Sequence, residues 1–197
     1  MIIPAVMQIH TYRRLVGPHL GLHGRWRLRW TVESAEHLGY VGEGWTAAVD
    51  AVDRSATGVP LVADIGVGRI LCAKAPETDA AGREVLTGTV VIVDGPMAVR
   101  EGQRRDVIDP ASENAFVTAT VTGLRLASMP YDYVVESGDP IEFDGRVGQW
   151  FDLAPVRGSQ LVTRIDGPPS ELRHGDLQGD DGVMWQEMLV VDLDTED

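Results

Sequence analysis

Hydrophobic and polar residues alternate along several short segments of the chain, and the clearest case is Arg-Trp-Arg-Leu-Arg-Trp at residues 25–30. Successive side chains of an extended chain point to opposite faces. The arginines of this segment therefore share one face, and the tryptophans and the leucine share the other. A second clear case is residues 117–122, where valine and alanine alternate with threonine. Both patterns predict half-buried β-strands.

Other extended segments recur between turns rich in glycine and proline. They cover residues 45–52, 69–73, 88–94, 131–136, 140–143, 146–147, 160–166 and 183–193. Asp144-Gly145 between two of them predicts a hairpin, because a type I′ turn needs φ > 0 at both central residues. Helical signals are weak, and residues 78–86 could form only a short helix broken by Gly82. About nine or ten short strands with little helix predict an all-β fold, either an antiparallel β-barrel or a sandwich.

The chain has 197 residues, of which 44% are hydrophobic and 24% charged. These values are typical of a globular chain, and the length indicates a single β-rich domain over residues 1–197. The most polar interior segment is residues 99–115. We expect it to be a long loop, with a junction between two lobes as the alternative.

Charge is distributed unevenly along the chain. Residues 1–32 contain five arginines and no acid, so the rest of a chain with net charge −13 carries −13 − 5, or −18. Residues 175–197 contain eight acids and no base. A chain this acidic repels the phosphates of duplex DNA, so we expect no binding to duplex nucleic acid.

Cys72 is the only cysteine, which excludes an intrachain disulfide and a cysteine zinc site. It lies in the apolar run Ile-Leu-Cys-Ala, so we expect a buried, reduced thiol. The first seven residues lack the basic region of a signal peptide, and no apolar run reaches the ~18 residues of a membrane span. These features predict a cytoplasmic protein that does not associate with membranes.

Neither of two candidate metal motifs has the context that such a site needs. His19 and His23 would share a face only on a helix, which the neighbouring Gly-Pro and glycine disfavour. The acidic segment 176–182 lacks the alternating oxygen ligands and the final glutamate of an EF-hand. We expect no metal and no cofactor.

The richest group of side chains with acid–base chemistry is Tyr131-Asp132-Tyr133 together with Glu142. A carboxylate inside an apolar cavity has a raised pKa and can act as a general acid. One hypothesis is therefore a small β-barrel isomerase or cyclase that binds an apolar small molecule. The alternative for these residues is a strand edge with exposed tyrosines and solvated carboxylates.

The hypothesis we favour is a binding or self-association module. Arg25, Arg27 and Arg29 would lie roughly 6.5–7 Å apart along a strand, which matches alternate carboxylates such as Asp192 and Asp194 on a neighbouring strand. We therefore expect this arginine strand to pair with the acidic C-terminal strand. The pairing could occur within one chain or between protomers of a homo-oligomer.

A third hypothesis is a binder of anions or single-stranded nucleic acid. It requires an arginine face that is not covered by acid, and it requires Trp26 or Trp30 to be exposed so that bases can stack. No segment of the chain resembles a motif of a known family.

Overall fold

The computed structural model describes residues 1–12, 17–31, 42, 44–54, 61–93, 114–135, 141–143, 146–148, 151–156, 158–173 and 184–195. Within these ranges the chain forms one short helix, α1 (Ile9–Tyr12), and otherwise strands. The strands are β1 (Ile2–Met7), β2 (His23–Trp26), β3 (Leu28–Trp30), β4 (Trp45–Ala48), β5 (Ala51–Arg54), β6 (Leu61–Asp64), β7 (Arg69–Cys72), β8 (Glu77–Thr78), β9 (Glu84–Gly88), β10 (Val91–Val93), β11 (Val117–Val135), β12 (Ile141–Phe143), β13 (Arg146–Gly148), β14 (Phe151–Pro155), β15 (Leu161–Arg164) and β16 (Met184–Asp194). The expected all-β class is confirmed.

Most strands belong to one eleven-stranded sheet with the order β14-β11-β16-β1-β10-β3-β7-β6-β5, and β15 and β2 also pair with β11. Two smaller sheets have the orders β4-β9-β8 and β12-β13. The β1–β10 and β3–β7 pairs are parallel, so the expectation of a purely antiparallel sheet is wrong. The described strands follow an open path from β14 to β5, and this path does not close into a barrel.

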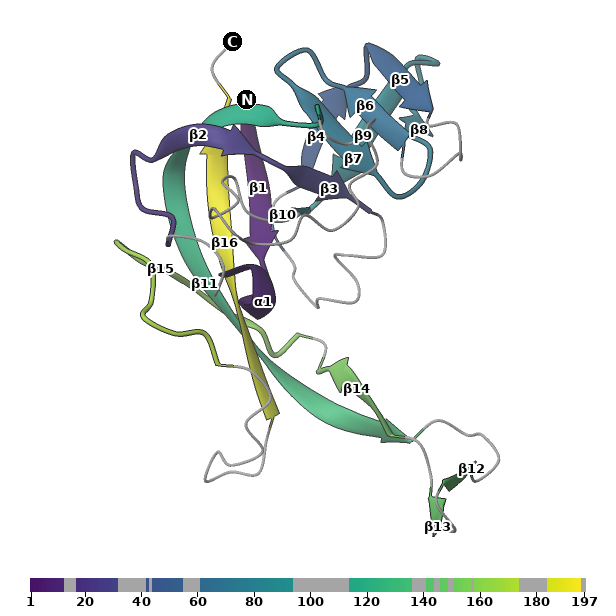
Figure 1. The fold of residues 1–197 in the computed structure, drawn as a ribbon, viewed down its shortest axis with the longest axis vertical. Coiled ribbons are helices and arrows are strands. Elements are labelled where there is room, and N and C mark those ends of the chain that lie inside the picture. The colour runs from purple at the N-terminus through teal and green to yellow at the C-terminus, as the bar shows by residue number, and fades with distance from the viewer. Residues whose placement is uncertain are drawn as a thin grey trace, which may run out of the picture.

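The large sheet curls strongly because of a constraint at Arg27. This residue alone separates β2, which pairs with β11, from β3, which pairs with β10. Between β2 and β3 lie β11, β16, β1 and β10, so a flat sheet would place β2 and β3 about 24 Å apart. The two Cα steps through Arg27 span at most ~7 Å. The sheet must therefore bend toward itself, and Figure 1 shows β2 and β3 as a continuous band across the upper part of the molecule.

The alternation at residues 25–30 is confirmed. Trp26, Leu28 and Trp30 are buried in the main core, and the arginines between them are exposed or half-buried. Residues of the three-stranded sheet, including Trp45 and Leu86, belong to the same core. The main core therefore joins this small sheet to the curled large sheet.

The central strands β1 and β16 are buried on both faces. Along β16, Leu189, Val191 and Leu193 face the main core. Met188 and Val190 belong to a second cluster with Val6 and Met129 on the opposite face of the sheet. Burial on both faces explains why β1 and the second half of β16 read as nearly continuous apolar runs and not as alternating ones.

The long strand β11 continues below the body of the molecule in Figure 1, where β14 pairs with it and the β12–β13 hairpin lies beyond. Phe143 pairs with Arg146, as expected for a two-residue Asp-Gly hairpin. The short helix expected at residues 78–86 is wrong. That segment is the β8–β9 hairpin, in which the Asp79 carboxylate accepts hydrogen bonds from the backbone N–H groups of Ala81 and Arg83, 2.8 and 2.9 Å away.

Several expectations fall outside the described residues. These are the polar segment up to residue 113 and the acidic segment 176–182. The stretch from His19 to His23 is described, and it contains a turn in which the Leu22 N–H donates to the His19 carbonyl. It has no helix that could bring the two imidazoles onto one face.

Cys72 is fully buried, and burial raises the pKa of its thiol to about 11. Only the thiolate reacts with disulfide reagents, so we expect native protein at pH 8 to be labelled roughly a hundredfold more slowly than unfolded protein. With an aromatic disulfide as the labelling reagent, the absorbance of the aromatic thiol that it releases measures both labelling rates. Rapid labelling while near-ultraviolet circular dichroism stays native would contradict the buried position.

Candidate functional site

A groove with a volume of about 910 Å³ lies over β1, β16, β11 and β15, and Gly42, Gly44 and Trp45, at the start of β4, also line it. Strand alternation explains the placement, because Ile2 and Asp192 project to the side opposite their core neighbours Ile3 and Leu193. Its apolar and charged walls include Ile2, Pro4, Val162, Arg125, Arg164 and Asp192. The groove therefore combines apolar surface with charge of both signs.

The central polar contact of the groove is the ion pair between Asp192 of β16 and Arg125 of β11. A guanidinium N–H of Arg125 donates to Asp192 Oδ1. The side chains are 26% and 24% exposed, for Arg125 and Asp192 respectively, so water screens the pair only in part. This contact holds both charges in a defined position on the sheet.

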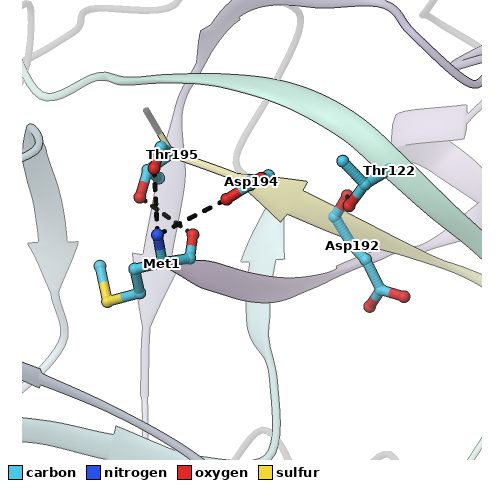
Figure 2. Close-up of polar contacts among 5 residues, drawn as sticks. All are labelled: Met1, Thr122, Asp192, Asp194 and Thr195. Atoms are coloured by element: carbon cyan, nitrogen blue, oxygen red, sulfur yellow. Dashed lines mark hydrogen bonds and ion pairs between the residues drawn. The ribbon is translucent and has the colours of Figure 1, made fainter. Parts of the chain in front are cut away.

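A β-bulge beside the ion pair shapes the floor of the groove. The register between β11 and β16 shifts between Val121 and Gly123, and Gly123 lies opposite Asp192. A Cβ at position 123 would lie 3.2 Å from Asp192 Cβ and would overlap the carboxylate. The absence of a side chain at Gly123 therefore allows the Asp192 carboxylate to lie against β11. The hydroxyl of the bulged Thr122 donates to the Asp192 carbonyl at 3.3 Å, and Figure 2 shows these two residues side by side.

Arg164 of β15 lies directly opposite Arg125 in the antiparallel pairing, and both side chains line the groove. Like charges directly opposite each other on a sheet are destabilising. Arg164 is exposed and makes no hydrogen bond or ion pair with any residue that the structure describes. Among the described residues that line the groove, the three charged groups sum to 2 − 1, or +1, in a protein of net charge −13. The described part of the lining is thus cationic on an acidic molecule.

Two large apolar side chains of the groove are exposed to solvent. Ile2 is 56% exposed and Val162 is 37% exposed. They enter from different strands, β1 and β15, and would lose water contact if a ligand filled the groove. The groove can accordingly bind a molecule that is part anionic and part apolar.

The strand ends next to the groove are joined by polar contacts between Met1 and the end of β16, drawn in Figure 2. The Met1 amino group donates to the Thr195 carbonyl at 3.0 Å and lies 3.5 Å from Asp194 Oδ1. The Thr195 N–H and hydroxyl both donate to the Met1 carbonyl at 2.9 Å. These contacts hold β1 in register with β16, where Ile2 lies opposite Asp194 and Pro4, another apolar wall of the groove, lies opposite Asp192.

The expected pairing of the arginine strand with the C-terminal strand within one chain is wrong. Both edges of β16 are occupied, one by β1 and the other by β11. Arg25 instead lies across from Thr118 of β11, with its guanidinium 4.3 Å from the ring centroid of Phe116. Arg27 is half-buried and Arg29 is exposed. The acids meet other partners: Asp192 pairs with Arg125, and Asp194 pairs with the amino group of Met1.

The tryptophans of this strand cannot stack on bases. Trp26 is 1% exposed and Trp30 is fully buried, and their indole N–H groups donate to the carbonyls of Ala119 and Thr87. The condition that one of them be exposed, on which the nucleic-acid hypothesis depended, is therefore not met.

The structure places Tyr131 and Asp132 on opposite faces of β11, as alternation predicted. Tyr131 packs against the second cluster, and burial raises the pKa of its phenol. Asp132 is exposed. The side chains of Tyr133 and Glu142 lie outside the described residues, and the catalytic role of all four stays a prediction. Neither Tyr131 nor Asp132 is among the described residues that line the groove.

Reasoning from the sequence missed Arg125, Arg164 and Gly123. The alternation in Leu124-Arg125-Leu126 could have placed Arg125 on the polar face of a strand. The position of Arg164 opposite it depends on a pairing between segments almost forty residues apart. No local pattern reports such a pairing.

Comparison with protein-family models, with curated proteins and with solved structures finds no match to this chain. Among the described residues, no group of three or more histidine, cysteine, aspartate or glutamate side chains could hold a metal ion. No helix in that part of the chain is long and apolar enough to cross a membrane. The groove is therefore the feature from which we infer function.

Asp192→Asn should lower the free energy of unfolding by about 1–2 kcal/mol, because it removes the charge that balances the partly buried Arg125. Asp194→Asn is the matched control. It lies two residues further along β16 and is 48% exposed, so its loss should be below ~1 kcal/mol. Urea denaturation of the wild type and the two variants measures both values. Equal losses in the two variants would show that the Asp192–Arg125 pair contributes no more to the free energy of unfolding than the exposed Asp194 does.

Proposed function

We propose that the protein is a binding protein whose groove holds the anionic group of a ligand that also has an apolar part. The observation that carries this proposal is the position of Arg164 opposite Arg125, where the single carboxylate of Asp192 faces two guanidiniums. Among the hypotheses drawn from the sequence, this is a form of the binding module. In this form, Arg125 and Arg164 take the role that the sequence pattern indicated for Arg25, Arg27 and Arg29.

Electrostatics supports an anion at this position. An anion that contacts both guanidiniums would convert their mutual repulsion into two attractive contacts. Arginine binds carboxylate and phosphate oxygens through two parallel N–H donors, and such charge-assisted hydrogen bonds are stronger than neutral ones. Asp192 limits the excess charge to one unit, which favours a ligand with a single negative group near Arg164.

Apolar contact supports the second part of the proposal. Ile2 and Val162 present apolar area to the same groove in which the arginines lie. A ligand pocket typically has mostly apolar walls and a few polar groups that fix orientation. An amphiphilic ligand would use Arg164 for orientation and the two aliphatic side chains for contact area.

We further propose that the curled part of the sheet acts as a small barrel-like scaffold. The one-residue connection at Arg27 ties β11 to β10, and the strands between them carry the floor of the groove. A scaffold of this kind keeps Asp192 and Arg125 at a constant separation, so that the groove is formed before the ligand arrives.

Octanoate is a suitable probe for this proposal, because it joins one carboxylate to an apolar chain. We expect isothermal titration calorimetry to detect octanoate binding that weakens as salt is added. Octanol has the chain without the charge, and acetate has the charge without the chain, so both should bind more weakly. Arg164→Gln should weaken octanoate binding about tenfold or more, the equivalent of one charge-assisted contact.

The matched control is Arg25→Gln, which removes an exposed arginine of the arginine strand and changes the net charge equally. Binding that depends on Arg25 and is indifferent to Arg164 would contradict the groove as the site. It would assign anion binding to the arginine strand instead.

A further inference from the structure

We infer that the occupant of the groove is an extended acidic peptide segment that adds as a strand to the free edge of β15. This inference rests on the proposed function, because it uses the same cationic site, but it names the class of ligand. Three observations support it: the exposure of β15, the direction of its backbone groups, and the spacing of its groove-facing side chains.

β15 is an edge strand. It pairs with β11 along Arg125 to Ser128, and none of the described strands pairs with its other edge. All four of its residues are exposed, and Leu161 is 62% exposed. Figure 1 shows β15 at the margin of the body. Proteins normally protect such an apolar edge, so an open one is a position where another strand can pair.

The backbone direction follows from one hydrogen bond. The Ile165 N–H donates to the Leu124 carbonyl at 3.0 Å, which makes this an antiparallel hydrogen-bonded pair. Such pairs alternate along an antiparallel ladder, so Thr163 and Leu161 also direct their N–H and carbonyl groups to β11. The N–H and carbonyl groups of Val162 and Arg164 therefore face away from β11. They present two donors and two acceptors to an incoming strand.

The same two residues direct their side chains to the groove. Val162 and Arg164 are two positions apart and both line it. Residues directly opposite on an added strand would lie about 4.5–5.5 Å away, between Cβ atoms. The best complement is therefore an apolar residue opposite Val162 and an acidic residue opposite Arg164, with one residue between them. The net charge of +1 on the described lining residues favours that acid, and the volume of about 910 Å³ leaves room for its neighbours.

The test uses blocked synthetic peptides and the full chain. The first peptide, acetyl-Thr-Thr-Glu-Thr-Val-Thr-Thr-amide, places glutamate and valine on one face of a strand, in the order that an antiparallel strand needs to bring glutamate opposite Arg164 and valine opposite Val162. An isomer with adjacent valine and glutamate places them on opposite faces. We expect calorimetry to show that the alternating peptide binds about tenfold more tightly than the isomer, and that Arg164→Gln removes this difference.

N-methylation of the peptide tests the backbone contacts directly. One version carries methyl groups on the valine and glutamate amides, and the other carries them on the intervening and following threonine amides. Antiparallel addition to β15 requires the first set of N–H groups, so only the first version should lose binding; parallel addition would reverse the two. Equal behaviour of the two versions would overturn strand addition.

The remaining outcomes separate the two proposals. If octanoate binds in an Arg164-dependent way and the alternating peptide does not bind, the peptide inference fails and the proposed function stands. If neither binds, both fail. Val162→Pro removes an N–H that faces away from β11 and leaves the β11 ladder intact. If sizing of the free protein shows a dimer that this variant dissociates, a second copy occupies the edge and the inference of a foreign peptide is overturned.

Discussion

Alternating apolar burial along β16 holds this structure together. Leu189, Val191 and Leu193 face the main core, while Met188 and Val190 face the second cluster. A slip of one residue would exchange these faces, so that the Asp192 carboxylate would point into the main core and both clusters would have to pack side chains of the wrong size. The register of β16 with β1 and β11 is therefore strongly specified, and the positions of the remaining groups follow from it.

The groove is one consequence of that register. Asp192 lies on the face of Met188 and Val190 but is not part of the second cluster, and it lines the groove instead. The bulge at Thr122 brings Gly123 opposite Asp192, and Gly123 leaves space for the carboxylate to reach Arg125. The ion pair between Asp192 and Arg125 thus forms on the same sheet face as the second cluster, next to its buried apolar side chains.

Charge complementarity between distant segments had little influence on the pairing of strands. An exposed ion pair contributes about 0–1 kcal/mol, which is less than the burial of a single leucine. The arginine segment accordingly pairs with β11 and β10, where Trp26 and Trp30 are buried, and does not pair with the acidic strand β16. The acids of β16 pair with cations that lie next to them in the folded chain: Asp192 with Arg125, Asp194 with the amino group of Met1, and Glu187 with Arg173.

The sequence by itself determined the all-β class, the inward tryptophans of residues 25–30, the hairpin at Asp144-Gly145 and the burial of Cys72, because each depends on local alternation or turn chemistry. It did not determine strand order, the parallel pairs or the curl imposed at Arg27, since these depend on which distant segments meet. The candidate site belongs to the second group. Asp192 was recognised as a candidate from its strand, but its partner Arg125, the facing Arg164 and the space at Gly123 come from three other parts of the fold. Only tertiary structure could assemble them, because a short-range pattern carries no information about the residue on the next strand.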